Sequence, residues 1–355
     1  MGRPRRDEMS SKERMDALMS GQQPDRVPFD PFARGFCARN VGYSVASFYN
    51  DPEKSFQSQV WTKEQYGYDG NPSFGYASYG AWEFGGEVKF PSSEWSQAPS
   101  ITRYAVESEE DVDKLELPDV KTAGFLPLAM EFSRLQAEHG TAITLVLGSS
   151  FTIAGNMCPV EILYRWMLRK PELVHRLLRL ATAHIIDTVK YWADIFGAEQ
   201  VIPQIWEPLA NNDIISPKQF EHFILPYLQE SSASILGTGI KHIFYHICGQ
   251  QNLNLPYWSQ VSMGNPGICS VGSEIEIGTA IKHLGDKAII AGNIAPHILL
   301  TGRPQQVYDL CKNAIEAGKK APRGFMLMSG CETPPDTPPY NIYMMRKAIN
   351  DSGWY

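Results

Sequence analysis

The chain has 355 residues, enough to bury a large hydrophobic core, and at this length a single domain is best accommodated by a barrel. Its hydrophobic fraction of 43% and charged fraction of 20% are those of an ordinary globular protein, which excludes a disordered or fibrous chain. With 32 basic and 39 acidic residues the net charge is −7, and because phosphate binding needs a basic face, nucleic-acid binding is excluded as the main function.

The first 140 residues carry irregular patterns. Ser10 is followed three residues later by Glu13, a capping-box pattern that predicts a short helix running to Gly21. A short strand is predicted over residues 27–30, ending at Asp30. Residues 34–100 are rich in Tyr, Gly, Phe and Trp without a clear period, so we expect helices and long loops that decorate the core.

From about residue 140 the pattern becomes regular. Short apolar runs that predict strands alternate with helical segments, and this alternation indicates parallel βαβ units. No glycine-rich nucleotide-binding motif follows the first of these strands, so a (β/α)8 TIM barrel with N-terminal helical and loop additions is favoured, as a single domain over residues 1–355. The predicted strands are 142–147, 201–205, 242–246, 268–271, 288–291 and 325–328, and the predicted helices are two within 159–196, then 217–236, 278–284 and 304–317.

Polar or metal-binding residues follow four of these strands. Glu207 comes after the strand 201–205, and His246 and Cys248 end the strand 242–246. Asn293 comes after 288–291, and Cys331 after 325–328. In a barrel the carboxyl ends of the strands form the mouth of the active site, so we expect these side chains to lie on one face.

One imidazole and two thiols form a candidate zinc site. His246, Cys248 and Cys331 are the soft ligands that Zn²⁺ prefers, and three protein ligands with a fourth position open are typical of catalytic zinc. In an extended chain His246 and Cys248 point in the same direction, because strand residues alternate faces. The alternative is a buried histidine and two buried thiols with no metal.

Four further positions are candidates with open alternatives. Glu207 and Asp30 each end a strand and could be catalytic, as a general base or a substrate orienter, or could only cap a helix. Asn293 is a candidate for cofactor binding because of its place after a strand. Tyr76 belongs to an aromatic cluster that could line a pocket for a planar ligand or could be ordinary packing. Glu274 could fill the fourth zinc position or lie exposed.

The remaining cysteines indicate a reducing environment. Six cysteines scattered through a chain of this size are not a disulfide framework. Cys158, Cys269 and Cys311 lie in helical or strand patterns and are expected to pack, whereas Cys37 is either packed or reactive. No apolar run is long enough for a membrane span and no signal-peptide pattern is present, so the sequence predicts a cytoplasmic protein.

Several segments resemble those of the uroporphyrinogen decarboxylase superfamily, whose fold is a TIM barrel. The resemblance covers roughly residues 10–355 and is dense after residue 140. The segments that carry it are Gly148-Ser149-Ser150-Phe151-Thr152-Ile153-Ala154, Pro171-Glu172-Leu173-Val174-His175, Ile215-Ser216-Pro217-Lys218-Gln219-Phe220, His246-Ile247-Cys248-Gly249, Gly292-Asn293-Ile294-Ala295-Pro296 and Gly330-Cys331-Glu332-Thr333-Pro334-Pro335.

Two branches of this superfamily differ in their motifs. True decarboxylases carry an Arg-Gln-Ala-Gly-Arg-Tyr segment after the first strand, whereas residues 32–39 here space their arginines differently. The branch of cobalamin-dependent methyltransferases is marked by H-x-C and a distant cysteine that bind zinc, and His246, Cys248 and Cys331 match those positions. Where that branch places an acid after the strand ending at Val271, this chain has Gly272-Ser273, so the fourth ligand would be water or Glu274.

The resemblance therefore implies a zinc-dependent methyltransferase. Its cofactors would be Zn²⁺ and a corrinoid (cobalamin) carried by a partner protein, and the methyl group would move to or from a small molecule such as a thiol, tetrahydrofolate or a methyl ether. The alternatives are a decarboxylase-like lyase acting on another carboxylated substrate and a non-catalytic tetrapyrrole- or corrinoid-binding protein. The sequence leaves open whether the chain forms a homodimer.

Overall fold

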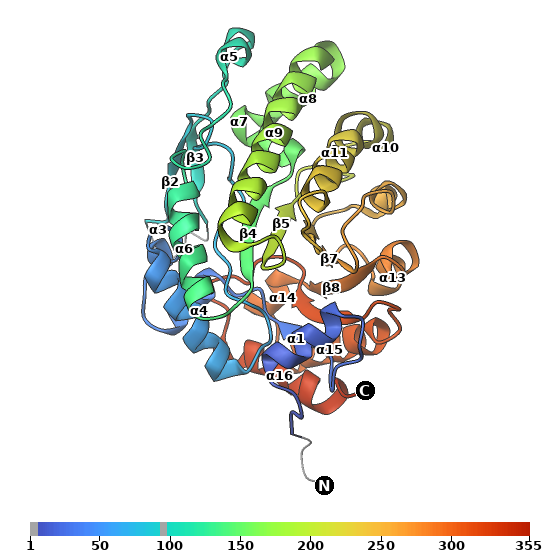
Figure 1. Ribbon diagram of the computed structural model, residues 1–355. Helices are drawn as coiled ribbons and strands as arrows, with labels where there is room; N and C mark the ends of the chain where they lie inside the picture. The colour runs from blue at the N-terminus through green and yellow to red at the C-terminus, as the bar shows by residue number, and fades with distance from the viewer. Residues whose placement is uncertain (1–5, 93–97) are drawn as a thin grey trace.

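A curled, fully parallel sheet surrounded by helices forms the centre of the molecule (Figure 1). The computed structural model describes residues 6–92 and 98–355. Four of the strands are buried along their whole length because helices cover the outside and the barrel core fills the inside. In spatial order they are β1 (Phe29–Asp30), β9 (Phe325–Ser329), β8 (Ala288–Ile294), β7 (Gly267–Val271), β6 (Phe244–Ile247), β5 (Val201–Trp206) and β4 (Ile143–Gly148).

An irregular segment over residues 69–75 takes the place of an eighth strand between β1 and β4. Asp69 donates its backbone N–H to the carbonyl of Phe29 (2.6 Å), and Phe74 forms a parallel bridge with Leu145. The segment is not a regular strand because Pro72 has no N–H to donate to a ladder. With this segment the sheet closes into a TIM barrel. The fold that the sequence predicts is therefore confirmed.

The helices that link the strands lie on the outside of the barrel, and most agree with the predicted ranges. The predicted helix 217–236 is interrupted by a π-helical turn, and β6 and β8 end later than predicted, so Asn293 lies within β8. The connecting helices are α7 (Ser150–Met157), α8 (Val160–Arg169), α9 (Pro171–Phe196), α10 (Pro217–Gln219), η1 (Phe220–Ile224), α11 (Leu225–Leu236), η2 (Asn252–Asn254), α12 (Leu255–Trp258), α13 (Ile277–Leu284), α14 (Pro296–Thr301), α15 (Pro304–Gly318) and α16 (Pro339–Ser352).

The N-terminal part of the chain adds the helices and loops that the sequence predicts, together with a two-stranded hairpin that it does not. The hairpin strands are antiparallel, mostly exposed and too short for their pattern to show in the sequence. These elements are α1 (Ser11–Met19), α2 (Gly35–Asn40), α3 (Val45–Asn50), α4 (Pro52–Tyr66), β2 (Glu87–Lys89), β3 (Ser100–Arg103), α5 (Glu109–Lys114) and α6 (Leu126–Glu138).

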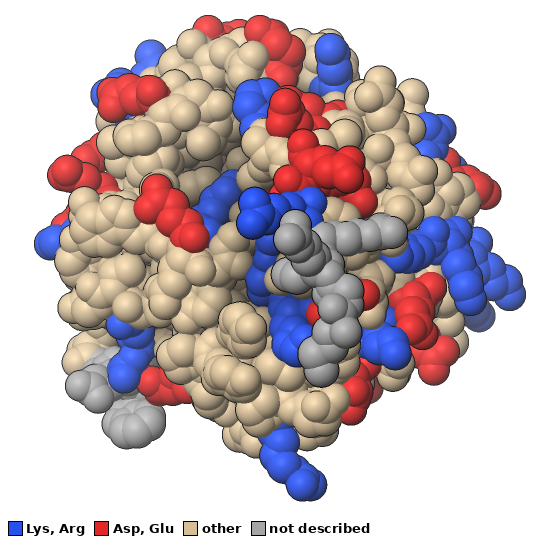
Figure 2. All heavy atoms as spheres, turned by 90° about the horizontal axis from the view of Figure 1, so that it is seen from below, with Lys and Arg blue, Asp and Glu red and all other residues tan. Residues whose placement is uncertain are grey.

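Helix α1 covers the N-terminal end of the barrel, where Leu18 packs into its interior. Ser10 caps this helix with the predicted capping box to Glu13. Seen from below the view of Figure 1, the surface has basic and acidic side chains interspersed (Figure 2). Among the residues described, no helix is both long and apolar enough to cross a membrane.

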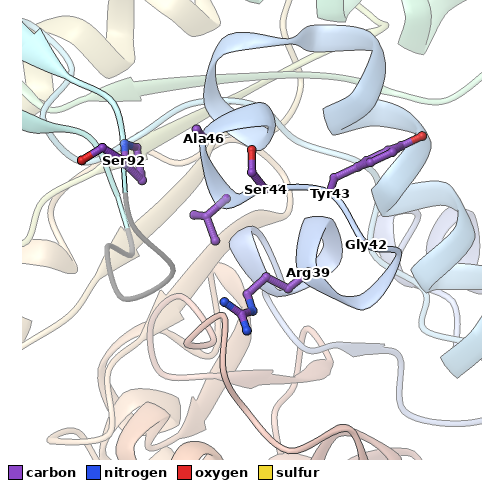
Figure 3. A pocket seen from close by; sticks show the side chains of 8 residues that line it. Arg39, Gly42, Tyr43, Ser44, Ala46 and Ser92 are labelled. Atoms are coloured by element: carbon purple, nitrogen blue, oxygen red, sulfur yellow. The ribbon is translucent and has the colours of Figure 1, made fainter.

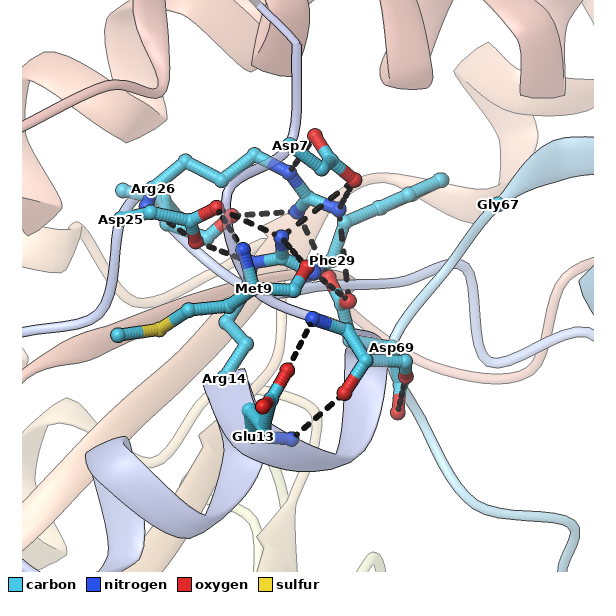
Figure 4. A network of polar contacts seen from close by, with 12 residues as sticks. Asp7, Met9, Glu13, Arg14, Asp25, Arg26, Phe29, Gly67 and Asp69 are labelled. Atoms are coloured by element: carbon cyan, nitrogen blue, oxygen red, sulfur yellow. Dashed lines mark hydrogen bonds and ion pairs between the residues drawn. The ribbon is translucent and has the colours of Figure 1, made fainter.

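A buried network of ion pairs fixes the N-terminal segment to the barrel (Figure 4). Asp69, which is 1% exposed, accepts from Arg14 at 2.6 Å and from Arg26 at 2.7 Å. Asp25 and Asp7 hold the remaining donors of these two guanidinium groups. Because each buried charge has an opposite partner, the network avoids the large cost of an isolated buried charge.

Candidate metal centre and active site

Three metal-binding side chains converge at the C-terminal end of the barrel. His246 lies in β6, Cys248 follows it by two residues, and Cys331 follows the end of β9. Two strands, β7 and β8, separate β6 from β9 in the sheet, so the three side chains meet across the barrel mouth. Their ligand atoms all lie within 4.8 Å of one another. The structure thus brings together the three residues that the sequence predicts as zinc ligands.

Two glycines allow these loop ends to approach. A Cβ atom on Gly272 would lie 3.0 Å from Cα of Cys248 and 2.6 Å from Oε2 of Glu274. A Cβ atom on Gly330 would lie 2.7 Å from the backbone nitrogen of Ser273. Side chains at these positions would push apart the loops that carry the two thiols.

Ser270 orients the imidazole of His246. The two residues are register partners on β6 and β7, and Nδ1 of His246 lies 3.1 Å from Oγ of Ser270. The other ring nitrogen, Nε2, is buried and has no hydrogen-bond partner among the described residues. If Nδ1–H donates to Ser270, Nε2 offers its lone pair to a metal, as in zinc sites where a second residue holds the ligating histidine.

The two thiols shift each other's pKa in opposite directions. A hydrogen bond from the Cys248 thiol lowers the pKa of Cys331, and His246 lowers it further, while the same interaction and burial raise the pKa of Cys248. Cys331 is therefore the thiol of the pair that loses its proton more readily. A thiolate and an unpartnered imidazole nitrogen fit Zn²⁺, which binds deprotonated cysteine and neutral histidine.

A wall of aromatic rings with one buried arginine adjoins the imidazole. Phe32 packs edge-on against His246 (5.3 Å between ring centroids) and against Trp206 (5.6 Å). The guanidinium carbon of Arg34 lies 4.5 Å from the Trp206 ring centroid. Nε of Arg34 and Nε1 of Trp206 are buried donors without a partner among the described residues. No sequence pattern marks these residues as functional, because their stacking depends on how the chain turns after β1.

That turn is made by Asp30, which was predicted as catalytic. Phe32 has φ +51°, a conformation that non-glycine residues rarely adopt, and its N–H donates to Oδ1 of Asp30 (2.8 Å). Asp30 therefore holds the backbone that presents Phe32 to His246. Burial raises the pKa of the Asp30 carboxyl. A catalytic role for Asp30 stays a prediction.

Glu332, next to Cys331, forms a second buried polar group beside Arg34. Tyr49 donates its hydroxyl to Oε1 of Glu332 (2.8 Å). Burial raises the pKa of Glu332 to about 7, although the charge of Arg34 opposes this shift. The guanidinium of Arg34 also donates to the carbonyl of Gly75 (2.7 Å). The arginine is thus held in place by several contacts while its Nε stays unpaired.

Glu207 lies directly after β5, as predicted, but its carboxylate is fully engaged. Oε1 accepts from the backbone N–H groups of Leu209 (2.9 Å) and Ala210 (2.8 Å) and from the Thr152 hydroxyl (3.0 Å). Oε2 accepts from Ser149 in a very short hydrogen bond. Burial raises the pKa of Glu207, and these donors oppose the shift. The capping alternative, which the sequence left open, agrees with this geometry.

Asn293 and Tyr76, the predicted cofactor-binding residues, make contacts within the protein. The amide of Asn293 donates to the carbonyl of Ile275 (2.6 Å). The ring of Tyr76 packs against Phe125 with 4.8 Å between centroids, and its buried hydroxyl has no partner among the described residues. Their roles in cofactor binding stay predictions.

The other candidate ligand and the other thiols are not members of the trio. Glu274 is exposed and does not belong to the cluster of His246, Cys248 and Cys331. Cys37, for which a reactive thiol was one alternative, is fully buried and donates to the Ala33 carbonyl (2.6 Å), and burial raises its pKa to about 12. The reactive alternative is therefore wrong. Cys158, Cys269 and Cys311 are buried, as expected.

A cavity of about 630 Å³ lies near the loop that carries Cys331 (Figure 3). Arg39, Tyr43, Ser44 and Ser92 are among the residues that line it. Arg39 also pairs with Asp336 (3.1 Å), which joins α2 to this loop. The cavity thus adjoins the segment between β9 and α16.

A comparison with protein-family models decides the family. The model described as uroporphyrinogen decarboxylase (URO-D) matches residues 10–352. The chain belongs to this family. The relatives of this chain include both methyltransferases and decarboxylases. Membership of the family alone therefore does not distinguish methyl transfer from decarboxylation.

The relatives within the URO-D family have low sequence identity to this chain, but the similarity extends over most of its length. Methylcobamide:CoM methyltransferase MtaA of Methanosarcina barkeri is 28% identical over 255 residues, which cover 70% of each chain. Uroporphyrinogen decarboxylase of Coxiella burnetii is 26% identical over 269 residues, covering 71% of this chain and 69% of the relative. A solved structure of a methyltransferase from Methanosarcina mazei superposes with a TM-score of 0.81 at 22% identity, over 97% of this chain and 99% of the other, which shows the shared fold.

Proposed function

We propose that the protein is a zinc-dependent methyltransferase that moves a methyl group between a corrinoid on a partner protein and a small thiol. The observation that carries this proposal is the convergence of His246, Cys248 and Cys331 at the barrel mouth. The similarity to methylcobamide:CoM methyltransferase MtaA and to a methylated-thiol–coenzyme M methyltransferase of Methanosarcina mazei, 27% identical over 227 residues, supports it.

The three residues would hold the metal with one position open. Zinc bound there would lower the pKa of an acceptor thiol so that it is a thiolate at neutral pH. Tetrahedral zinc with Zn–S of about 2.3 Å sets ligand atoms roughly 3.5–3.8 Å apart, so a cluster within 4.8 Å needs only a small contraction. Ser270 keeps the imidazole in the orientation that this requires.

Methyl transfer then requires one bond to form and one to break. The corrinoid would supply the methyl carbon to the acceptor sulfur and would keep the electron pair of the broken cobalt–carbon bond, which takes cobalt from Co(III) to Co(I). The thiol proton leaves to solvent. Because the cobalt has to reach the sulfur, the corrinoid partner docks on the C-terminal face of the barrel. The reverse direction uses the same contacts.

The wall beside His246 indicates an acceptor that carries an acidic group. Arg34 and Trp206 each leave a buried N–H without a partner, and a buried unpaired donor costs about 1–3 kcal/mol. A carboxylate or sulfonate on the substrate would accept from both. Glu207 is better suited to bracing the loop after β5 than to moving a proton, since its oxygens already accept four hydrogen bonds.

The test is a spectral assay of methylcobalamin consumption with a panel of thiols, with and without an acidic group. The wild-type protein is expected to convert methylcobalamin to Co(I) with acid-bearing thiols. Cys331→Ser is expected to abolish this reaction, whereas Cys311→Ala, which removes a buried thiol on α15, keeps it.

The decarboxylase alternative is decided by a parallel assay. Formation of coproporphyrinogen from uroporphyrinogen, together with no consumption of methylcobalamin by any thiol, would overturn the proposal. Retention of full methyl transfer in Cys331→Ser would also contradict it.

A further inference from the structure

Two histidines meet on the outer ring of helices, away from the barrel mouth trio. His175 lies in α9 and His222 in the π-helical turn η1, which packs against α9. Their Nε2 atoms are 3.4 Å apart, and the rings are nearly perpendicular at 83°. His175 belongs to one of the segments that resemble the URO-D family, yet the proposed function gives it no role.

The imidazole of His175 is oriented by its neighbours. Its Nδ1 lies 2.9 Å from the hydroxyl of Tyr227, which in turn donates to the carbonyl of His175 (3.4 Å). Because the Tyr227 hydroxyl hydrogen points to the carbonyl of His175, the Tyr227 oxygen is free to accept a hydrogen bond from Nδ1–H of His175. The lone pair of His175 then lies on Nε2, which faces His222. The ring also stacks on Phe223 with 4.9 Å between centroids. Metal-binding histidines are held in this way, through their other nitrogen.

The π-helical turn places His222 opposite His175. Pro226 has no N–H to donate to the carbonyl of His222, and Leu225 bonds instead to Phe220, five residues back. Phe220 and Phe223 are buried and anchor the widened turn, so His222 is left on the exposed side. The position of His222 opposite His175 is therefore set by the backbone of the π-helical turn and by its buried phenylalanines.

We propose that His175 and His222 form a second metal site, for a divalent cation of tetrahedral preference such as Zn²⁺ or Co²⁺. With metal–nitrogen bonds of about 2.0–2.1 Å, two ligands of a tetrahedral centre lie roughly 3.3–3.4 Å apart, whereas neighbouring ligands of a square-planar centre lie roughly 2.8–2.9 Å apart. The observed 3.4 Å fits the tetrahedral case. Water would fill the remaining positions, since His222 is exposed.

The imidazole of His175 is also available as a neutral ligand. Burial, the neighbouring His222 and the charge of Arg179 all lower the pKa of His175. A neutral His175 therefore offers Nε2 near neutral pH. This site is independent of the proposed function, because it shares no residue with the trio at the barrel mouth.

Titration of the metal-free protein with Co²⁺ tests the proposal. The thiolate site gives a sulfur-to-cobalt charge-transfer band, and a site of two imidazoles adds ligand-field absorption without that band. The wild-type protein is expected to bind two equivalents. His222→Ala is expected to lose only the equivalent without the charge-transfer band, and Cys331→Ser only the equivalent with it, so that failure of one site is distinguishable from failure of the other.

Two further variants sharpen the test. His297→Ala removes a lone exposed imidazole and is expected to change nothing. Tyr227→Phe keeps both imidazoles but removes the acceptor of Nδ1–H, and is expected to weaken the second site about 10- to 100-fold. If the wild-type protein binds no second equivalent, or if that equivalent survives in both His175→Ala and His222→Ala, the proposal is wrong.

Discussion

Replacing Ser270 by alanine tests how the imidazole of the candidate zinc site is held. In the wild-type protein Nδ1 of His246 lies 3.1 Å from the Ser270 hydroxyl, and both side chains are buried. Metal binding through Nε2 requires Nδ1 to carry the proton, and in Ser270→Ala that N–H has no acceptor. In the metal-free protein the ring can instead carry its proton on Nε2, which lies within 4.8 Å of the Cys331 sulfur.

The cost therefore falls mainly on the metal-bound state. An unsatisfied buried donor costs about 1–3 kcal/mol, which corresponds to a loss of zinc affinity of about 5- to 150-fold. Loss of a residue that holds a metal-binding histidine gives losses in the same range. The free energy of unfolding of the metal-free protein is expected to change much less.

The assay is competition for Zn²⁺ with a chromophoric chelator, followed for Ser270→Ala and for a matched control. Ser231→Ala removes another buried serine hydroxyl, which donates to the carbonyl of Leu228 on α11, and is expected to leave zinc affinity unchanged. Equal zinc affinity in wild-type protein and Ser270→Ala would refute the assignment of Nε2 as the ligand and of Ser270 as the residue that holds the ring.

Three further predictions concern stability, pH and substrate choice. Asp69→Asn is expected to lower the free energy of unfolding in urea by about 3–5 kcal/mol, because it leaves Arg14 and Arg26 buried with too little negative charge; a loss below about 1 kcal/mol would contradict this. Burial lowers the pKa of His184 from 6.5 to about 4, so its contribution of about 3 kcal/mol is present above pH 6.5 and is lost as the pH falls toward 4. The free energy of unfolding, measured between pH 4 and 6.5, is expected to depend less steeply on pH in His184→Gln than in the wild-type protein. Identical slopes in the two proteins would refute the lowered pKa of His184. Arg34→Lys is expected to raise KM for acid-bearing thiols about 10-fold or more while leaving uncharged thiols unaffected, and an equal effect on both would contradict the role of Arg34.

The barrel and the metal ligands could be predicted because both depend on local patterns. Short apolar strands alternate with helices, which indicates the barrel. His246 and Cys248 stand two residues apart at the end of one strand, and because strand ends form the barrel mouth, both could be placed there. Cys331 likewise follows a predicted strand, over residues 325–328. The structure adds that Gly272, which stands where the resembling methyltransferase branch carries an acid, is needed for the loops to approach.

The rest of the site depends on contacts between distant parts of the chain. The stacking of Phe32, Trp206 and Arg34 depends on a residue at positive φ held by Asp30, and no sequence pattern predicts that conformation. Ser270 becomes a partner of His246 only through the register of β6 and β7. The segment that closes the barrel at residues 69–75 contains Pro72 and two glycines, so it lacks any strand pattern.

The most direct test of the metal centre is the charge-transfer spectrum of the Co²⁺-loaded protein, measured together with its zinc content after purification. We predict about one zinc per chain at a thiolate site, and a sulfur-to-cobalt band that is lost in Cys331→Ser while the circular dichroism spectrum stays unchanged. A wild-type protein that shows no such band, yet transfers methyl groups to thiols, would contradict the central role of His246, Cys248 and Cys331.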